Sequence, residues 1–171
     1  MMSEVGMDQP QQAENEPHLG YYCKLFAQLE VNRTKKRGNA PYKPILLLSV
    51  IELIAQGIIK ENRICVSSEL IETFNKYWNL LNSVDFKGGI ALPFFHLQND
   101  GFWMIQFKNI HNGIRPQTNN KLKEVVEYAT LDRELFALIQ KPTSRKELVD
   151  VLVNVWFSEY KSKIEIQRLT Y

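Results

Sequence analysis

Residues 92–107 constrain the fold most, because two apolar, aromatic runs lie on either side of Asp100-Gly101. Asp-Gly between two such runs is a strong hairpin signal, since glycine accepts the positive φ that a type I′ turn requires. Pro93 lies at the start of the first run, where a proline is tolerated at a strand end or on an edge strand. The segment therefore predicts a β-hairpin that caps a helical core or presents its aromatic side chains to a partner.

Most other apolar residues recur at helical spacing. Residues 19–31 predict an amphipathic helix, and residues 45–54, apolar nearly all round, predict a buried central helix with Pro44 in its first turn. Ser67 or Ser68 is a candidate N-cap for the following helix. The side chains that this helix would bury are Leu70, Phe74, Tyr77, Trp78 and Leu81.

The C-terminal half predicts three further helices. They are expected over residues 122–130, over residues 133–140 after a cap at Asp132, and after a capping box of Ser144 and Glu147. The fold class expected is mainly α (α+β): a compact helical domain with one β-hairpin and a candidate extra strand at residues 63–66. Residues 1–17 are expected to be a disordered tail, residues 18–160 the domain, and residues 161–171 a C-terminal extension or truncated linker.

Composition bounds the class of protein. The two cysteines, Cys23 and Cys65, lie in apolar stretches far apart, which predicts core thiols of a reduced, cytoplasmic protein. No apolar run approaches the length of a membrane span, and the N-terminus has no signal-peptide pattern. The net charge of +2 is too small to indicate a partner, so the distribution of charge matters more than its sum.

That distribution is uneven, because residues 32–43 hold five cations and no acid. The cations are Arg33, Lys35, Lys36, Arg37 and Lys43. One interpretation is a solvated linker; the other is a loop that contacts DNA phosphates and releases counterions. The second is favoured by position, since the loop leads into a helix N-terminus at Pro44, where unpaired N–H groups also attract an anion.

Catalytic signatures are absent from the sequence. His18, His96 and His111 have no metal-ligand spacing such as HExxH, and neither CxxC, GxSxG nor a PD-(D/E)xK pattern occurs. The sequence therefore predicts no catalytic residues, no metal ligands and no cofactor, and an independent enzyme is the last of the alternatives.

Three blocks of sequence carry a resemblance to a known family. They read APYKPILLL at residues 40–48, PFFHLQNDGFW at residues 93–103 and LDRELF at residues 131–136. Over roughly residues 19–158 the chain resembles the N-terminal domain of HNH-type restriction endonucleases, which is the sulfur-binding domain that recognises phosphorothioate-modified DNA. In that family the nuclease half would follow residue 160, so cleavage is not expected from this chain, which ends at Tyr171.

The resemblance implies a site as well as a fold. Pro93 matches the family's pocket proline, while Tyr42 and Lys43 match an aromatic or histidine followed by a basic residue whose alkyl stem lines the pocket. Leu92 stands where a tyrosine is expected, and His96 stands where a small residue is expected. Leucine can still form an apolar wall of the pocket, whereas histidine would either fill the pocket or contact a phosphate.

The first hypothesis is therefore a double-stranded-DNA-binding module for phosphorothioate or otherwise modified DNA, acting as the recognition part of a restriction system. A second is a protein-interaction adaptor that presents the aromatic hairpin or the Trp156 helix to a separate nuclease partner. A third is a fragment of a longer nuclease.

Overall fold

The computed structural model describes residues 17–31, 33–34, 38–39, 42–81, 89–109, 111 and 113–158. The elements in chain order are α2 (Pro17–Ala27), β1 (Arg33–Thr34), β2 (Gly38–Asn39), α3 (Tyr42–Ala55), α4 (Ser68–Leu81), α5 (Ala91–His96), the 3-10 helix η1 (Leu97–Asp100), β3 (Trp103–Phe107), α6 (Asn119–Val125), β4 (Val126–Leu131), α7 (Arg133–Gln140) and α8 (Pro142–Trp156). The mainly α prediction is confirmed.

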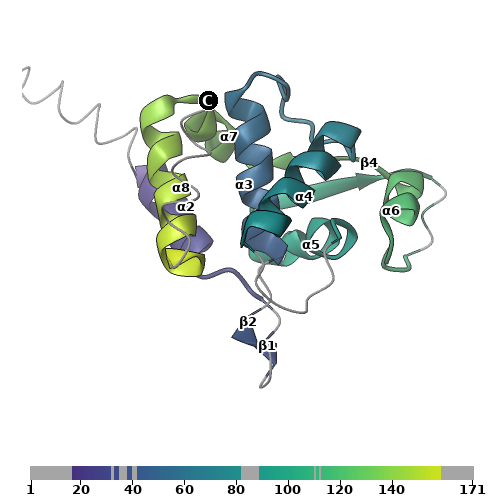
Figure 1. Ribbon diagram of the computed structural model, residues 1–171. Helices are drawn as coiled ribbons and strands as arrows, with labels where there is room; N and C mark the ends of the chain where they lie inside the picture. Colours follow the sequence, from purple (N-terminus) through teal and green to yellow (C-terminus); the bar gives the residue numbers. More distant parts are fainter. Residues whose placement is uncertain are drawn as a thin grey trace, which may run out of the picture.

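Helix α3 is the centre of the domain (Figure 1). Residues 43–54 are all buried, as an all-apolar helix requires, and α3 packs against α4, α5, α7 and α8. Helix α2 packs against α7 and α8 on one side, while the antiparallel pair of β3 and β4 runs behind α4 toward α6 (Figure 1). Burial of this central helix is thus shared by elements from the whole chain.

Helix α4 confirms its predicted face and cap. Its buried residues are Leu70, Phe74, Tyr77, Trp78 and Leu81. The Leu70 amide donates a hydrogen bond of 3.1 Å to Ser67 Oγ, which satisfies one of the unpaired N–H groups of the first turn.

The predicted hairpin over residues 92–107 is wrong. Ala91–His96 is helical and Leu97–Asp100 continues as a 3-10 helix, which Gly101 ends at a φ of 90°. The left-handed glycine was predicted correctly, but it terminates a helix instead of joining two strands. Strand β3 instead pairs with β4, with Met104 opposite Thr130.

The helix predicted at residues 122–130 is half wrong, because α6 ends at Val125 and β4 begins at Val126. The apolar β3 needs a partner strand, and residues 126–131 supply one rich in β-branched and aromatic side chains. The extra strand predicted at residues 63–66 is reduced to a single bridge from Ile64 to Ala129.

Three local predictions fail in instructive ways. Asp132 is the N-cap residue of α7, yet its carboxylate makes no cap and instead accepts a hydrogen bond of 2.7 Å from the Tyr22 hydroxyl. Helix α8 begins at Pro142, so Ser144 lies inside the first turn and donates to the Leu138 carbonyl instead of forming a capping box. Cys23 is half-buried, but Cys65 is exposed and is not a core thiol.

The aromatic residues of residues 92–107 belong largely to the core. Phe94, Phe102 and Trp103 are buried, and the Trp103 indole donates a hydrogen bond of 2.9 Å to the Phe94 carbonyl. Trp156 is partly buried and donates to the Phe26 carbonyl. The main aromatic side chains on which the adaptor hypothesis rested are therefore buried or packed against the core, and the hypothesis itself stays a prediction. Among the described residues, no helix is both long and apolar enough to cross a membrane.

Candidate nucleic-acid interface

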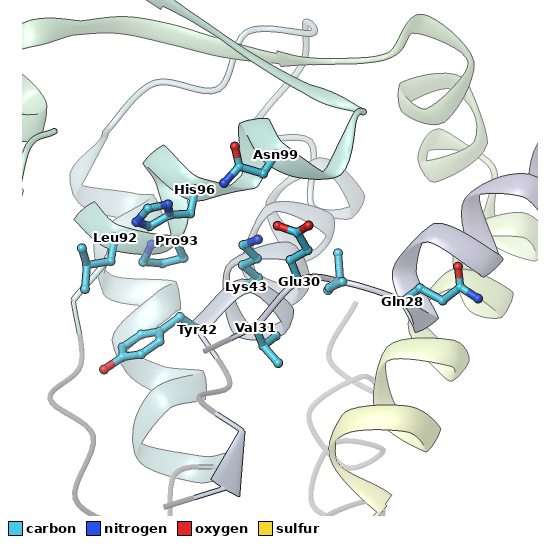
Figure 2. Close-up of a pocket in the computed structure, with 10 residues that line it drawn as sticks. Gln28, Glu30, Val31, Tyr42, Lys43, Leu92, Pro93, His96 and Asn99 are labelled. Carbon is cyan, nitrogen blue, oxygen red and sulfur yellow. The ribbon is translucent and has the colours of Figure 1, made fainter. Parts of the chain in front are cut away.

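A pocket of about 510 Å³ opens between α5, the start of α3 and the segment that follows α2 (Figure 2). Its lining residues are Gln28, Leu29, Glu30, Val31, Tyr42, Lys43, Leu92, Pro93, His96 and Asn99. Three stretches far apart in the sequence therefore meet at one opening.

One wall of the pocket is apolar. Pro93 lies in the first turn of α5, mostly buried, with its ring exposed to the pocket beside Leu92 (Figure 2). Tyr42 completes this wall, and its ring stacks on Trp78 of α4 with centroids 5.0 Å apart and planes 22° apart. Because Trp78 in turn stacks on Phe74, the Tyr42 ring is held in place before any ligand arrives.

Asp100 ties the pocket together. Its Oδ2 lies 2.6 Å from Lys43 Nζ, and both side chains are nearly inaccessible to solvent, at 5% and 7% exposure. Its Oδ1 accepts a hydrogen bond of 2.9 Å from the Glu30 amide. One carboxylate thus joins the segment after α2, the first turn of α3 and η1, so it positions the residues that line the pocket.

His96 lies at the edge of the pocket next to Arg115, a cation that no sequence pattern indicated. Arg115 Nη1 is 3.4 Å from His96 Nε2. Guanidinium can only donate, so Nε2 accepts and the ring proton resides on Nδ1. Burial, Arg115 and Lys43 together lower the pKa of His96 below its ordinary value, and the imidazole is therefore neutral at pH 7.

The five predicted pocket residues, Tyr42, Lys43, Leu92, Pro93 and His96, all line this one pocket. Of the five predicted phosphate contacts, Lys43 is buried and ion-paired, and Arg33 is described only as part of the backbone of β1. Lys35, Lys36 and Arg37 lie outside the described residues.

Sequence reasoning missed Glu30 in the pocket lining, Asp100 as the carboxylate that holds Lys43 and the Glu30 amide, and Arg115 beside His96. Asp100 was assigned to a turn, and its spacing of 57 residues from Lys43 carries no local signal. Arg115 lies 19 positions after His96, with a strand in between, so no motif connects the two.

Comparison with known proteins identified a matching family and solved structures with a similar fold. The sequence matches the family described as ScoMcrA-like, DNA sulfur-binding domain, over residues 22–168. No curated protein matches the chain.

Solved structures with the same fold include the sulfur-binding domain of SprMcrA complexed with phosphorothioated DNA. It is 18% identical with a TM-score of 0.63, over 84% of this chain and 88% of that one. The sulfur-binding domain of ScoMcrA, likewise complexed with phosphorothioated DNA, is 19% identical with a TM-score of 0.58, over 80% of this chain and 87% of that one.

A longer ScoMcrA structure, with sulfur-binding and SRA domains on phosphorothioated DNA, is 19% identical with a TM-score of 0.59, and this chain covers 42% of it. The sequence match spans most of the chain. This protein therefore belongs to the ScoMcrA-like DNA sulfur-binding domain family.

Proposed function

We propose that this chain binds double-stranded DNA and recognises a phosphorothioate linkage in the pocket around Pro93, as the recognition part of a modification-dependent restriction system. Residues 18–160 are the DNA-binding unit in this proposal. Support comes from the family to which the chain belongs and from its structural neighbours, which are sulfur-binding domains on phosphorothioated DNA. In this proposal the DNA is cleaved by a nuclease on another domain or another chain.

One observation carries the proposal: an apolar wall and a cation line the same pocket. A phosphorothioate keeps the negative charge of a phosphate, so a lysine or arginine alone does not distinguish the two. Sulfur is larger, more polarizable and less hydrated than oxygen, and contact with Tyr42, Leu92 and Pro93 favours it. That contact is worth about 1–3 kcal/mol if it buries as much as one small apolar group.

Affinity that does not depend on sulfur comes from cations around the pocket. In the proposal Arg33, Lys35, Lys36 and Arg37, which precede α3 in the sequence, contact backbone phosphates, and so does exposed Arg115 next to His96. Lys43 is already paired with Asp100, so its alkyl stem lines the pocket and its ammonium contributes only part of a charge.

The proposal is tested by fluorescence polarisation with two duplexes that differ only in one phosphorothioate linkage. The wild type should bind the modified duplex more tightly than the plain one. Leu92→Ser and Pro93→Ala should each reduce the ratio of the two affinities by roughly 5- to 10-fold, because each removes part of the apolar wall. Plain-duplex affinity should change little. Met104→Ala, which truncates a side chain 71% exposed on β3 outside the pocket, is the matched control.

Equal affinity of the wild type for the two duplexes at every salt concentration would reject sulfur recognition. The phosphate contacts are tested separately with Lys35→Gln, Lys36→Gln and Arg37→Gln combined. For both duplexes, the slope of log K against log salt should become shallower by about 0.9 for every phosphate that these side chains neutralise in the wild type. An unchanged slope would remove these residues from the interface.

A further inference from the structure

We infer that Glu30 reads the amino group of a cytosine next to the modified linkage. This inference deepens the proposed function and rests on it, because it requires DNA to occupy the pocket around Pro93. It assigns a sequence preference to a residue that neither the apolar wall nor the phosphate contacts explain.

Glu30 is held at the pocket by its main chain. Its amide donates to Asp100 Oδ1 at 2.9 Å, and the preceding Leu29 is buried in the core. The side chain itself is exposed and lines the pocket. Figure 2 shows its carboxylate directed into the opening, on the side where the Lys43 side chain ends. The carboxylate is therefore presented to a ligand from a fixed backbone position.

The charges of the described pocket make an extra carboxylate costly for a polyanion. Lys43 is the cation in the lining, and Asp100 already neutralises it at 2.6 Å. Within the described residues Glu30 has no ion-pair partner, and His96 is neutral. A carboxylate only accepts hydrogen bonds, so a DNA group that contacts it directly must be a hydrogen-bond donor.

Among the bases, cytosine fits this requirement best. In the major groove cytosine presents its N4 amino group without an adjacent acceptor, and Glu accepts from that group in known readout. Guanine and thymine present acceptors that repel a carboxylate, and adenine places N7 beside its amino group. Asn99, exposed on η1 in the same lining, has an amide that can donate to O6 of the paired guanine.

The test is a binding selection on a library of duplexes that carry one phosphorothioate linkage between randomised bases, followed by polarisation measurements on single sequences. The wild type should prefer cytosine at one flanking position by roughly 10-fold or more. Glu30→Gln should lose most of that preference. Replacing this cytosine by N4-methylcytosine, in which a methyl group takes the place of the groove-side hydrogen, should have the same effect on the wild type.

The control is Glu127→Gln, which removes the same charge from an exposed position on β4 outside the pocket lining and should leave the base profile unchanged. The inference is overturned if wild type and Glu30→Gln select the same bases, or if Glu30→Gln only tightens binding equally across the library. The same selection on unmodified duplexes separates the two proposals. A cytosine preference that depends on Glu30, without any preference for the modified linkage, would reject sulfur recognition alone.

Discussion

Helix α3 carries two buried ion pairs, one near each end, and they serve different purposes. Lys43 at the start pairs with Asp100, and Glu52, roughly 14 Å further along the helix, pairs with Lys76. Both join α3 to another element and both bury at least one charged side chain. They differ in how many hydrogen-bonding positions remain for a ligand.

The Glu52 pair is closed. The carboxylate, 4% exposed, accepts from Lys76 Nζ at 2.7 and 2.9 Å, from the Tyr77 hydroxyl at 2.5 Å and from Gln56 Nε2 at 3.1 Å. Four hydrogen bonds saturate its oxygens, so the buried charge is fully compensated within the core. The Glu52 carboxylate fixes α3 to α4 and has no acceptor position left for a ligand.

The Lys43 pair is open. Its ammonium has three donors, and Asp100 is its single acceptor among the described residues. Lys43 also lines the pocket, so this pair belongs to the candidate site. A closed buried pair thus stabilises the fold, whereas an open one positions a site, and three predictions test that difference.

The largest effect on stability is expected from Glu52→Ala. It removes the carboxylate that accepts from the buried Tyr77 hydroxyl and from the Lys76 ammonium, which should lower the free energy of unfolding by about 2–4 kcal/mol. Urea unfolding measures the decrease, with Glu127→Ala on the exposed side of β4 as the control. DNA affinity of the folded protein should not change; a parallel fall in affinity would show that the closed pair also supports the site.

Asp100→Asn should have a smaller effect on stability and a distinct effect on binding. Asparagine keeps an acceptor for the Glu30 amide but removes the charge that neutralises Lys43, so we expect the free energy of unfolding to fall by about 1–3 kcal/mol. The uncompensated ammonium should tighten binding of plain and phosphorothioate duplexes by the same factor, since both carry the same charge. A change in the ratio of the two affinities would contradict the separation of charge from sulfur contact.

The smallest effect concerns His96 and pH. Because its pKa is lowered in the folded protein, the unfolded chain binds the proton first as pH falls below about 6.5, and stability should decrease through that range. A bound phosphate favours the protonated ring, so DNA affinity should rise over the same range. His96→Gln should flatten both profiles, measured by thermal unfolding and by polarisation; unchanged profiles would mean that another group titrates.

The sequence alone was enough to predict helices whose buried face follows from the spacing of apolar residues. The stripe of Leu70, Phe74, Tyr77, Trp78 and Leu81 predicted the buried face of α4 correctly, because a period of 3.6 residues places these side chains on one side. The buried α3 followed from its composition, since an all-apolar helix has no face to expose.

Short apolar runs were ambiguous, and the structure decided them. A left-handed glycine suits a hairpin turn and the end of a helix equally, so Gly101 did not distinguish the two. The choice depended on the strand that pairs with β3, which is β4. Because β4 lies more than 20 residues after β3 begins, the sequence of residues 92–107 does not indicate which strand pairs with β3.

The sequence by itself determined, through the resemblance, which five residues would line the pocket, and the structure brings those five together. Only the tertiary structure decided which charged groups contact these residues. The Asp100 carboxylate reaches Lys43 across 57 residues of sequence, and Arg115 reaches His96 across 19. Such contacts depend on the packing of whole helices, whereas a sequence motif records only neighbours along the chain.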